Sequence, residues 1–387
     1  MRWGQLGWLI SLAGLPLSPF LWMPRLDFWH AQSAWMHYSL VILLVIALWQ
    51  GGWTVSINKP LAAWMAWIGC WTLVNWHQSI MLGKTYNLNL LMPFLHCCSI
   101  LFFVIAAMSL WTKAFLPTLL RWMARVSILI MLYGFLQLFQ LDQFLSNIDD
   151  KRTDLLVGTI GNPTHLAAYL ALCFPLLLAQ HGWRWRIATG MNLLLLGILL
   201  IRHGSIGGPI CAVITLALWT WHRRSRWGLI TLGGLSLFGL WLLWTHPTYL
   251  NPSGRLEAWR VFWDVFQRKP ITGLGTGAIA FLAETIKEPQ HPIHKWRHVH
   301  NEYLQLAIEQ GVIGFSLVLW AIGDSIRRAW RLRRDALVTT LSGCGITFLL
   351  LSLISFPWHL WLLASFGLVS YVGLILCEQE TCPPCPL

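Results

Sequence analysis

Four histidines lie within one short stretch of the chain, at His291, His294, His298 and His300. A zinc site needs three or four ligands at defined spacing, usually with a thiolate or a carboxylate among them. This stretch contains no cysteine, and the nearest carboxylates, Glu284 and Glu288, lie upstream of the histidines. A metal site is therefore the weaker interpretation, and we predict that the site holds no metal. For most of these residues a solvated loop position is the simpler expectation.

His300 differs from its neighbours because an apolar segment, predicted to be a helix, begins directly after it at Asn301. A helix N-terminus carries a partial positive charge, and this lowers the pKa of a nearby imidazole. An imidazole that is neutral at working pH can accept a proton from a hydroxyl group. His300 is therefore the candidate general base.

Arginines form a second group of candidates. Arg255 begins a predicted amphipathic helix that also carries Arg260, and Arg202 lies in another short polar connection. A guanidinium offers a planar fork that matches a phosphate or a diphosphate and stays charged at any working pH. The alternative, slightly favoured by the loop alone, is that Arg255 extends toward lipid headgroups.

Two further motifs carry glycine or proline. Gly273, Gly275 and Gly277 alternate, but no strand precedes them and no Gly-Lys-Ser/Thr follows, so a tight turn is favoured over a phosphate-binding loop. Asn162-Pro163 begins an apolar segment, with His165 within its first turn.

The amino-acid composition indicates what kind of protein carries these candidate residues. Of the 387 residues, 56% are hydrophobic and only 11% are charged, the mean hydropathy is +0.58, and 27 are Trp. Soluble domains carry about a quarter charged residues, and Trp is enriched at bilayer interfaces. This composition excludes an ordinary soluble enzyme and a disordered chain. It predicts an all-α, polytopic membrane protein, whose net charge of +12 reflects topology and anionic lipid rather than nucleic acid.

Apolar blocks long enough to cross a bilayer predict about twelve transmembrane helices. The N-terminal block is interpreted as the first span rather than a cleaved signal peptide, and the nine cysteines suggest no disulfide framework. The predicted spans are 4–22, 38–56, 61–77, 94–112, 122–141, 163–181, 187–202, 206–222, 228–246, 301–323, 336–355 and 357–377.

Lys and Arg residues orient these spans, because cytoplasmic connections are enriched in them. Arg223, Arg224 and Arg226 lie in one such connection, and a second arginine-rich connection follows at 327–334. Both termini are then cytoplasmic, and one long loop, 247–300, faces the periplasm. Within it, Leu256, Trp259, Phe262, Trp263 and Phe266 share one helical face, which predicts a helix lying along the membrane surface.

Several motifs, in the same order, resemble the O-antigen ligase and O-antigen polymerase superfamily. They are Gly158-Thr-Ile-Gly-Asn-Pro-Thr-His165, Gly254-Arg255, Pro270-Ile-Thr-Gly-Leu-Gly-Thr-Gly277, His300-Asn301-Glu302-Tyr303-Leu304, Glu309-Gln-Gly311 and Phe356-Pro357-Trp-His359. The resemblance covers about 155–375. It divides the chain into N-terminal helices (1–155), an O-antigen ligase-like region (156–377) and a short cytoplasmic tail (378–387).

The resemblance implies a GT-C-like glycosyltransferase of the bacterial inner membrane with its active site at the periplasmic face. Such enzymes transfer a glycan from undecaprenyl diphosphate to an acceptor, either lipid A-core or a growing glycan, with inversion and without a metal or other cofactor. The family's histidine falls on His300 and its Gly-Arg arginine on Arg255. A further family arginine is missing, because its place reads Ser205-Ile206-Gly207, and Arg202 is the nearest replacement.

His300 is thus the predicted catalytic residue, and the predicted substrate-binding residues are Arg255, Arg202, Arg260, Asn301 and Asn162. Ligase is slightly favoured over polymerase, and O-linked protein glycosylation stays open. A lipid or sugar transporter is the alternative from another class. It is disfavoured because transporters show internal repeats and ionisable residues at mid-membrane, which this sequence does not clearly have. A structural membrane subunit would leave the long loop unexplained.

The topology is testable with reporter fusions. We expect fusions at Arg224 and Arg331 to report the cytoplasm and a fusion at Pro289 to report the periplasm, because arginine-rich connections stay inside. A cytoplasmic signal at Pro289 would contradict the assignment of the active site, since the lipid-linked glycan is presented at the outer face.

Overall fold

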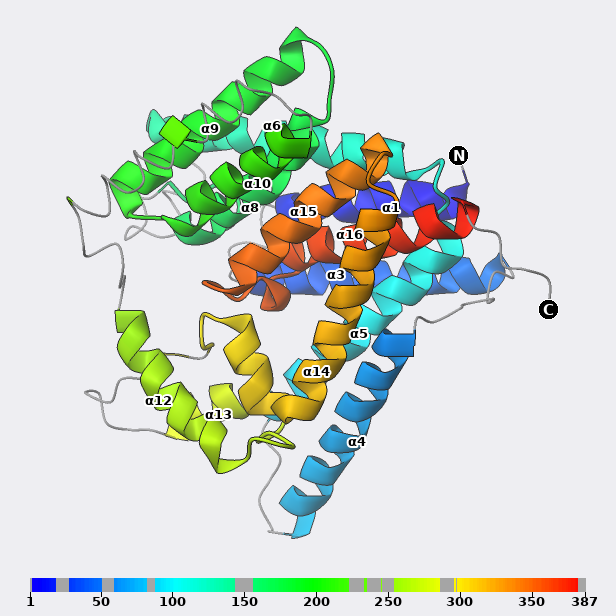
Figure 1. Ribbon diagram of the computed structural model, residues 1–387, viewed down its shortest axis with the longest axis vertical. Helices are drawn as coiled ribbons and strands as arrows, with labels where there is room; N and C mark the ends of the chain where they lie inside the picture. The colour runs from blue at the N-terminus through cyan, green and yellow to red at the C-terminus, as the bar shows by residue number, and fades with distance from the viewer. Residues whose placement is uncertain are drawn as a thin grey trace.

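A computed structural model describes residues 2–18, 28–50, 59–81, 88–142, 156–222, 233–234, 245, 254–285, 296 and 298–381. Over these ranges the chain is helical and contains no strand (Figure 1). The elements are α1 (Trp3–Gly14), η1 (Leu15–Leu17), α3 (Phe28–Trp49), α4 (Lys59–Met81), α5 (Leu88–Leu110), α6 (Leu116–Leu138), α8 (Pro163–Leu178), α9 (Trp183–His203), α10 (Gly207–His222), α12 (Arg255–Arg268), α13 (Ala278–Thr285), α14 (Glu302–Arg331), α15 (Ala336–Ser352), η5 (Pro357–His359) and α16 (Trp361–Thr381).

Five helices are long and apolar enough to cross a membrane. They are Ala31–Trp49 within α3, α6, α9, α14 and Trp361–Glu380 within α16. Shorter apolar helices, among them α8 and α10, lie between these in the chain. The protein is therefore a helical membrane protein, as its composition predicts. The number of twelve spans stays a prediction, because the span expected at 228–246 lies almost wholly outside the described residues.

Most predicted spans correspond to a helix with small shifts at the ends, but the second does not. The sequence predicts a span at 38–56, whereas α3 begins at Phe28 and ends at Trp49. The first turns of α3 contain polar residues, and a prediction based on apolar blocks therefore places the start of the span too late in the chain. Gln32 is one of them, and it is buried in the bundle rather than exposed in a connection.

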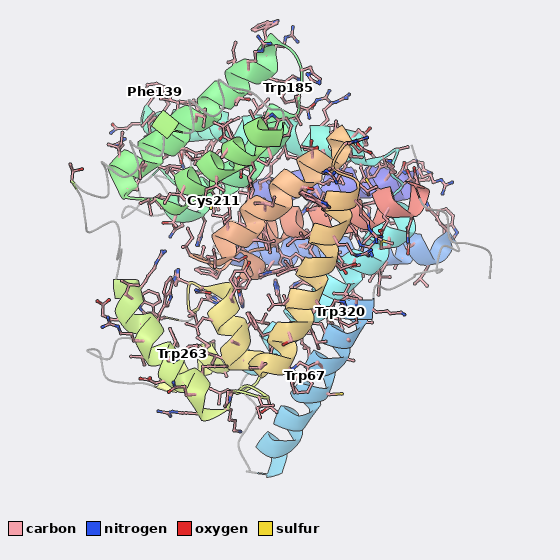
Figure 2. The ribbon with its side chains drawn as sticks, in the orientation of Figure 1. Trp67, Phe139, Trp185, Cys211, Trp263 and Trp320 are labelled. Atoms are coloured by element: carbon pink, nitrogen blue, oxygen red, sulfur yellow. The ribbon has the colours of Figure 1, made fainter. Side chains whose placement is uncertain are left out.

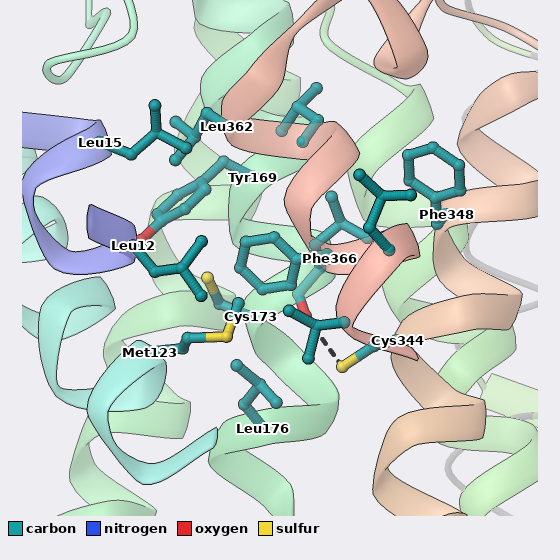
Figure 3. Close-up of a cluster of buried hydrophobic side chains, with 14 of the residues drawn as sticks. Leu12, Leu15, Met123, Tyr169, Cys173, Leu176, Cys344, Phe348, Leu362 and Phe366 are labelled. Atoms are coloured by element: carbon teal, nitrogen blue, oxygen red, sulfur yellow. Dashed lines mark hydrogen bonds between the residues drawn. The ribbon is translucent and has the colours of Figure 1, made fainter. Parts of the chain in front are cut away.

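Helix α8 is the centre of the bundle. It packs against α6, α9, α10, α15 and α16, and nearly all its side chains are buried. A helix that is apolar on every side is stable only when neighbours surround it, which is why α8 occupies this position. Figure 3 shows its side chains among those of α1, η1, α6, α15 and α16, with the labelled residues Leu12, Leu15, Met123, Tyr169, Cys173, Leu176, Cys344, Phe348, Leu362 and Phe366.

Charged side chains join several helices at one end of the bundle. Arg328 of α14 pairs with Asp324 (2.9 Å) and with Glu378 of α16. Lys113, between α5 and α6, pairs with Asp335 before α15 (3.3 Å), and its backbone N–H donates to Glu380. These residues come from connections that the sequence assigns to the same side of the membrane.

The predicted amphipathic helix is α12, and its bounds agree with the predicted stretch. Part of its apolar face packs against the protein, and its position along the membrane surface stays a prediction. Phe262 is fully buried in a second apolar cluster with Ile279 of α13 and Ile308 of α14. Only Leu256 (45% exposed) and Trp263 (51% exposed; Figure 2) keep much of their surface accessible. The helix is thus attached to the protein, because its buried side chains pack against those of α13 and α14.

The alternating glycines hold this loop against a kink in α14. Gly311 has φ 66° and ψ −175°, which interrupts the helix. The interruption releases the carbonyls of Ile308 and Glu309, and these accept hydrogen bonds from the N–H groups of Leu274 and Gly275 (2.8 Å each). Gly273 and Gly311 also lie where a side chain would overlap the opposite backbone. The glycine run therefore serves close backbone approach, a structural role of the kind the sequence favoured.

We expect Gly311→Ala to destabilise the protein. The residue has a left-handed φ, which costs a non-glycine residue about 1–3 kcal/mol, and the new Cβ would overlap the carbonyl oxygen of Ile271. Thermal unfolding in detergent should show a lower Tm. Gly323→Ala in the same helix is the matched control, because nothing lies within 4 Å of its added Cβ, and it should leave Tm unchanged or slightly raised. Equal Tm values for the two variants would contradict this role of the kink.

Candidate active site

The candidate site forms at the end of the bundle remote from the Arg328 cluster, around the connection between α15 and α16. Phe356 in this connection contacts four imidazoles. Ring centroids lie 4.5 Å from His298, 4.6 Å from His300, 5.1 Å from His165 and 6.5 Å from His359. Three separate parts of the chain thus place a histidine against one aromatic side chain.

Arg255 reaches the same connection from the first turn of α12. Its Nη1 donates a hydrogen bond to the carbonyl oxygen of Ile354 (2.8 Å), and its Nε is buried without a hydrogen-bond partner among the described residues. Arg255 is therefore partly buried and directed into the protein, in contrast to the alternative in which it extends toward lipid headgroups. Burial lowers the pKa of Arg255, but a guanidinium still keeps its charge at neutral pH.

His300 lies between two aromatic side chains. Its ring is edge-on to Trp296 (4.9 Å) and to Phe356. Burial, and then the positive charge of Arg255, lower the pKa of His300 to about 4. The direction agrees with the sequence prediction, and burial and the neighbouring cation are its causes. At neutral pH the imidazole is uncharged and can accept a proton.

His298 is a site residue that the sequence reasoning missed, because it was expected to be a solvated loop residue. Its imidazole stacks on Phe356 with an interplanar angle of 16°, and its Nδ1 is buried without a partner among the described residues. Burial, with a smaller contribution from His359, holds the pKa of His298 well below its ordinary value. Ser355, adjacent to Phe356, also has a buried hydroxyl without a described partner. Unsatisfied buried polar atoms are uncommon in proteins and often mark functional positions.

Behind these residues, a polar network links α14 to the α15–α16 connection. Glu302 accepts hydrogen bonds from the N–H of Trp358 (2.8 Å) and from Nδ1 of His359 (3.2 Å). Nε2 of Gln305 lies within hydrogen-bonding distance of Nε2 of His359 (3.2 Å). His96 of α5 lies 2.6 Å from the carbonyl oxygen of Trp358. The motif Phe356-Pro-Trp-His359, an aromatic and polar break between two apolar spans, was the sequence signal for this network.

An apolar cavity of about 190 Å³ adjoins the network. Side chains of α4, α5, α14, α15 and α16 line it, and Glu302, Gln305 and His359 lie in its wall. A concave apolar surface with a few convergent polar groups is the usual form of a small-molecule or lipid site.

The other predicted site residues serve as helix caps or lie at the surface. Asn301 and Asn162 are helix N-caps, and their side chains accept the N–H groups of Leu304 (3.0 Å) and Thr164 (2.8 Å). Arg202 and Arg260 are exposed, and no hydrogen bond or ion pair within the described part of the chain joins either one to Arg255 or His300. Their role in binding substrate stays a prediction.

The segment in which the family arginine is missing lies close to the site. Gly207 at the start of α10 faces Ile354, the residue whose carbonyl accepts the hydrogen bond from Arg255. The hydroxyl of Ser205, in the same segment, is buried without a described partner. Arg202 is one turn further back, in the last turn of α9.

No metal site is formed by the described residues, which hold no group of three or more His, Cys, Asp or Glu side chains that could bind an ion. His291 and His294 lie outside these residues. The prediction of a site without metal therefore stays a prediction.

Comparisons with known proteins point to one family. Residues 155–319 match the family described as O-Antigen ligase, and this region includes Arg255, His298 and His300. The chain is also 26% identical over 129 residues to a protein of Rickettsia bellii and 27% identical over 126 residues to one of Rickettsia conorii, both named as candidate polysaccharide ligases. These matches cover 32% and 30% of this chain. The match spans only about a third of the length of each relative, 31% of the Rickettsia bellii protein and 30% of the Rickettsia conorii protein.

The pKa of His300 predicts an unusual pH profile. Because its imidazole is neutral above about pH 4, the value of kcat/KM should stay level from pH 7 down to pH 5 and fall only as the pH approaches 4. The measurement is initial rate at low donor concentration over this range, with enzyme integrity checked at pH 7 after each exposure. An acid limb centred near 6.5, the value of an ordinary histidine, would contradict the burial of His300.

Proposed function

We propose that the protein transfers a glycan from undecaprenyl diphosphate to an acceptor hydroxyl at the periplasmic face of the bacterial inner membrane, because residues 155–319 match the O-antigen ligase family. One observation carries the proposal. A partly buried arginine and a neutral histidine, 45 positions apart in the chain, interact electrostatically at the same end of the helical bundle. This pair supplies a fixed cation for a diphosphate and a base for a hydroxyl group.

In the proposed reaction, the acceptor oxygen attacks the anomeric carbon of the lipid-linked glycan. The bond from that carbon to the diphosphate oxygen breaks, and undecaprenyl diphosphate leaves with the electron pair. The acceptor proton passes to His300. Attack from the face opposite the leaving group inverts the configuration at the anomeric carbon.

Arg255 stabilises the charge that develops on the leaving diphosphate. Its unpartnered Nε supports this assignment, since Nη1 is already held by Ile354 and so fixes the direction of the fork. The exposed Arg202 and Arg260 contribute at longer range, by attracting an anionic donor. The apolar cavity takes part of the isoprenoid chain, because its wall offers hydrocarbon contacts next to the polar network.

A ligase that uses lipid A-core as acceptor is our first candidate, as the family description favours. A polymerase that extends a growing glycan would use the same pair of residues. Purified protein in liposomes, supplied with the lipid-diphosphate-linked glycan and either lipid A-core or a second lipid-linked unit, distinguishes them by the product formed. Movement of donor across the membrane without any glycan transfer would support the transporter alternative.

Arg255 and His300 should fail in different ways. We expect Arg255→Lys to weaken donor binding as well as turnover, because it keeps the charge and loses the planar fork that holds the diphosphate in ground and transition states alike. His300→Ala should leave donor binding nearly intact and lower turnover about 10²–10⁴-fold. Donor binding measured by titration and single-turnover rates in liposomes separate the two effects.

Two controls accompany this test. Arg268→Lys, at the exposed end of the same helix, should behave like the parent protein. His300→Gln keeps hydrogen bonding but cannot accept the proton, so it should be as impaired as His300→Ala. If His300→Gln were nearly as active as the parent, His300 would position the substrate and would not be the base.

A further inference from the structure

His300 has a backbone conformation that is uncommon for its residue type. Its φ is 54°, and among the described residues only one other non-glycine residue, Gln140, has a positive φ. A side chain in this left-handed region is strained, because its Cβ approaches the neighbouring carbonyl oxygen. The strain persists only where surrounding contacts impose it.

The contacts that impose it converge on the preceding residue, Val299. The carbonyl oxygen of Val299 accepts a hydrogen bond from Nε1 of Trp259 in α12 (2.8 Å). The N–H of Val299 donates to Oε1 of Gln305 in α14 (3.1 Å). The Val299 side chain is itself fully buried in the α12–α13–α14 cluster. Both backbone polar groups of one residue are thus held by side chains from two different helices.

Each of these side chains is itself fixed in orientation. Nε2 of Gln305 donates to Glu309 (3.4 Å) and to His359 (3.2 Å), and so its oxygen faces Val299. Trp259 packs against the same apolar cluster. On the other side of His300, Asn301 is fixed as the N-cap of α14. His300 therefore connects two immobilised residues and has little freedom to leave the left-handed region.

We propose that Trp259 and Gln305 are positioning residues for catalysis, which act through the backbone of Val299 to hold the His300 imidazole between Trp296 and Phe356. This inference rests on the proposed role of His300 as the base. Neither residue needs to touch the substrate. Their effect is on the direction in which the imidazole accepts a proton, and a small misplacement of a catalytic group can cost as much as about 10²-fold in rate.

The test uses Trp259→Phe, which keeps an aromatic ring but removes the N–H donor together with part of the indole. We expect kcat to fall 10-fold to 100-fold while the donor KM stays within about twofold, because a displaced base affects turnover more than donor binding. Gln305→Met, of similar shape but without the acceptor, should act in the same direction. The matched control is Trp263→Phe in the same helix, whose side chain is half exposed and which should leave kcat unchanged. An unchanged kcat in Trp259→Phe overturns the inference.

A double-mutant cycle separates positioning from a general structural role. In the His300→Gln background the base is already lost, and Trp259→Phe should then have no further effect on the residual rate. The same loss in both backgrounds overturns the inference, since Trp259 would then act elsewhere.

A second cycle measures stability and does not depend on the role of His300 in catalysis. Glycine adopts a left-handed φ without strain, so His300→Gly should have a higher Tm than His300→Ala. This difference should shrink in the Trp259→Phe background, where the backbone of Val299 can relax. An equal difference in both backgrounds overturns the inference. If His300→Gln proved active while the difference did shrink, the assignment of His300 as the base would fail and the backbone restraint would stand.

Discussion

The hydrogen bond from Arg255 to the carbonyl of Ile354 is the contact on which the site depends. It joins helix α12 to the α15–α16 connection, and the two bonded residues are 99 positions apart in the chain. A charged donor makes a stronger hydrogen bond than a neutral one, and partial burial shields it from water. Without this contact, no hydrogen bond within the described part of the chain would hold the guanidinium of Arg255 against the α15–α16 connection.

The remainder of the architecture supports this contact from both sides. On the loop side, the kink at Gly311 exposes two carbonyls of α14, and the glycine run binds them, which fixes α12 and α13 over the end of the bundle. On the bundle side, Glu302 binds the N–H of Trp358 and the imidazole of His359, which fixes the connection carrying Phe356. Because α14 contributes to both sides, its N-terminal part is the common support of the loop and of the histidine cluster.

The sequence predicted local features well and long-range features poorly, for physical reasons. The extent of α12 follows from short-range periodicity, and it is as predicted. Local chemistry made Arg255 and His300 candidates, and their roles stay predictions. The sequence could not predict which residues of the α12 apolar face are buried. Leu256 and Phe262 are equally apolar in the sequence, and only packing in the folded protein buries Phe262 and leaves Leu256 exposed. The same limit applies to His298, whose burial is determined by Phe356, a residue 58 positions away.

The proximity of Arg255 and His300 also has a consequence for the proposed chemistry. In the protein without donor, the charge of Arg255 helps to lower the pKa of His300 to about 4, which makes the imidazole a weak base. A bound diphosphate places negative charge beside the guanidinium and offsets its effect on the imidazole, since the two electrostatic terms have opposite sign. Donor binding would therefore raise the pKa of His300 and strengthen the base. In the proposed mechanism, the arginine that binds the leaving group would thus also couple the basicity of His300 to the presence of donor.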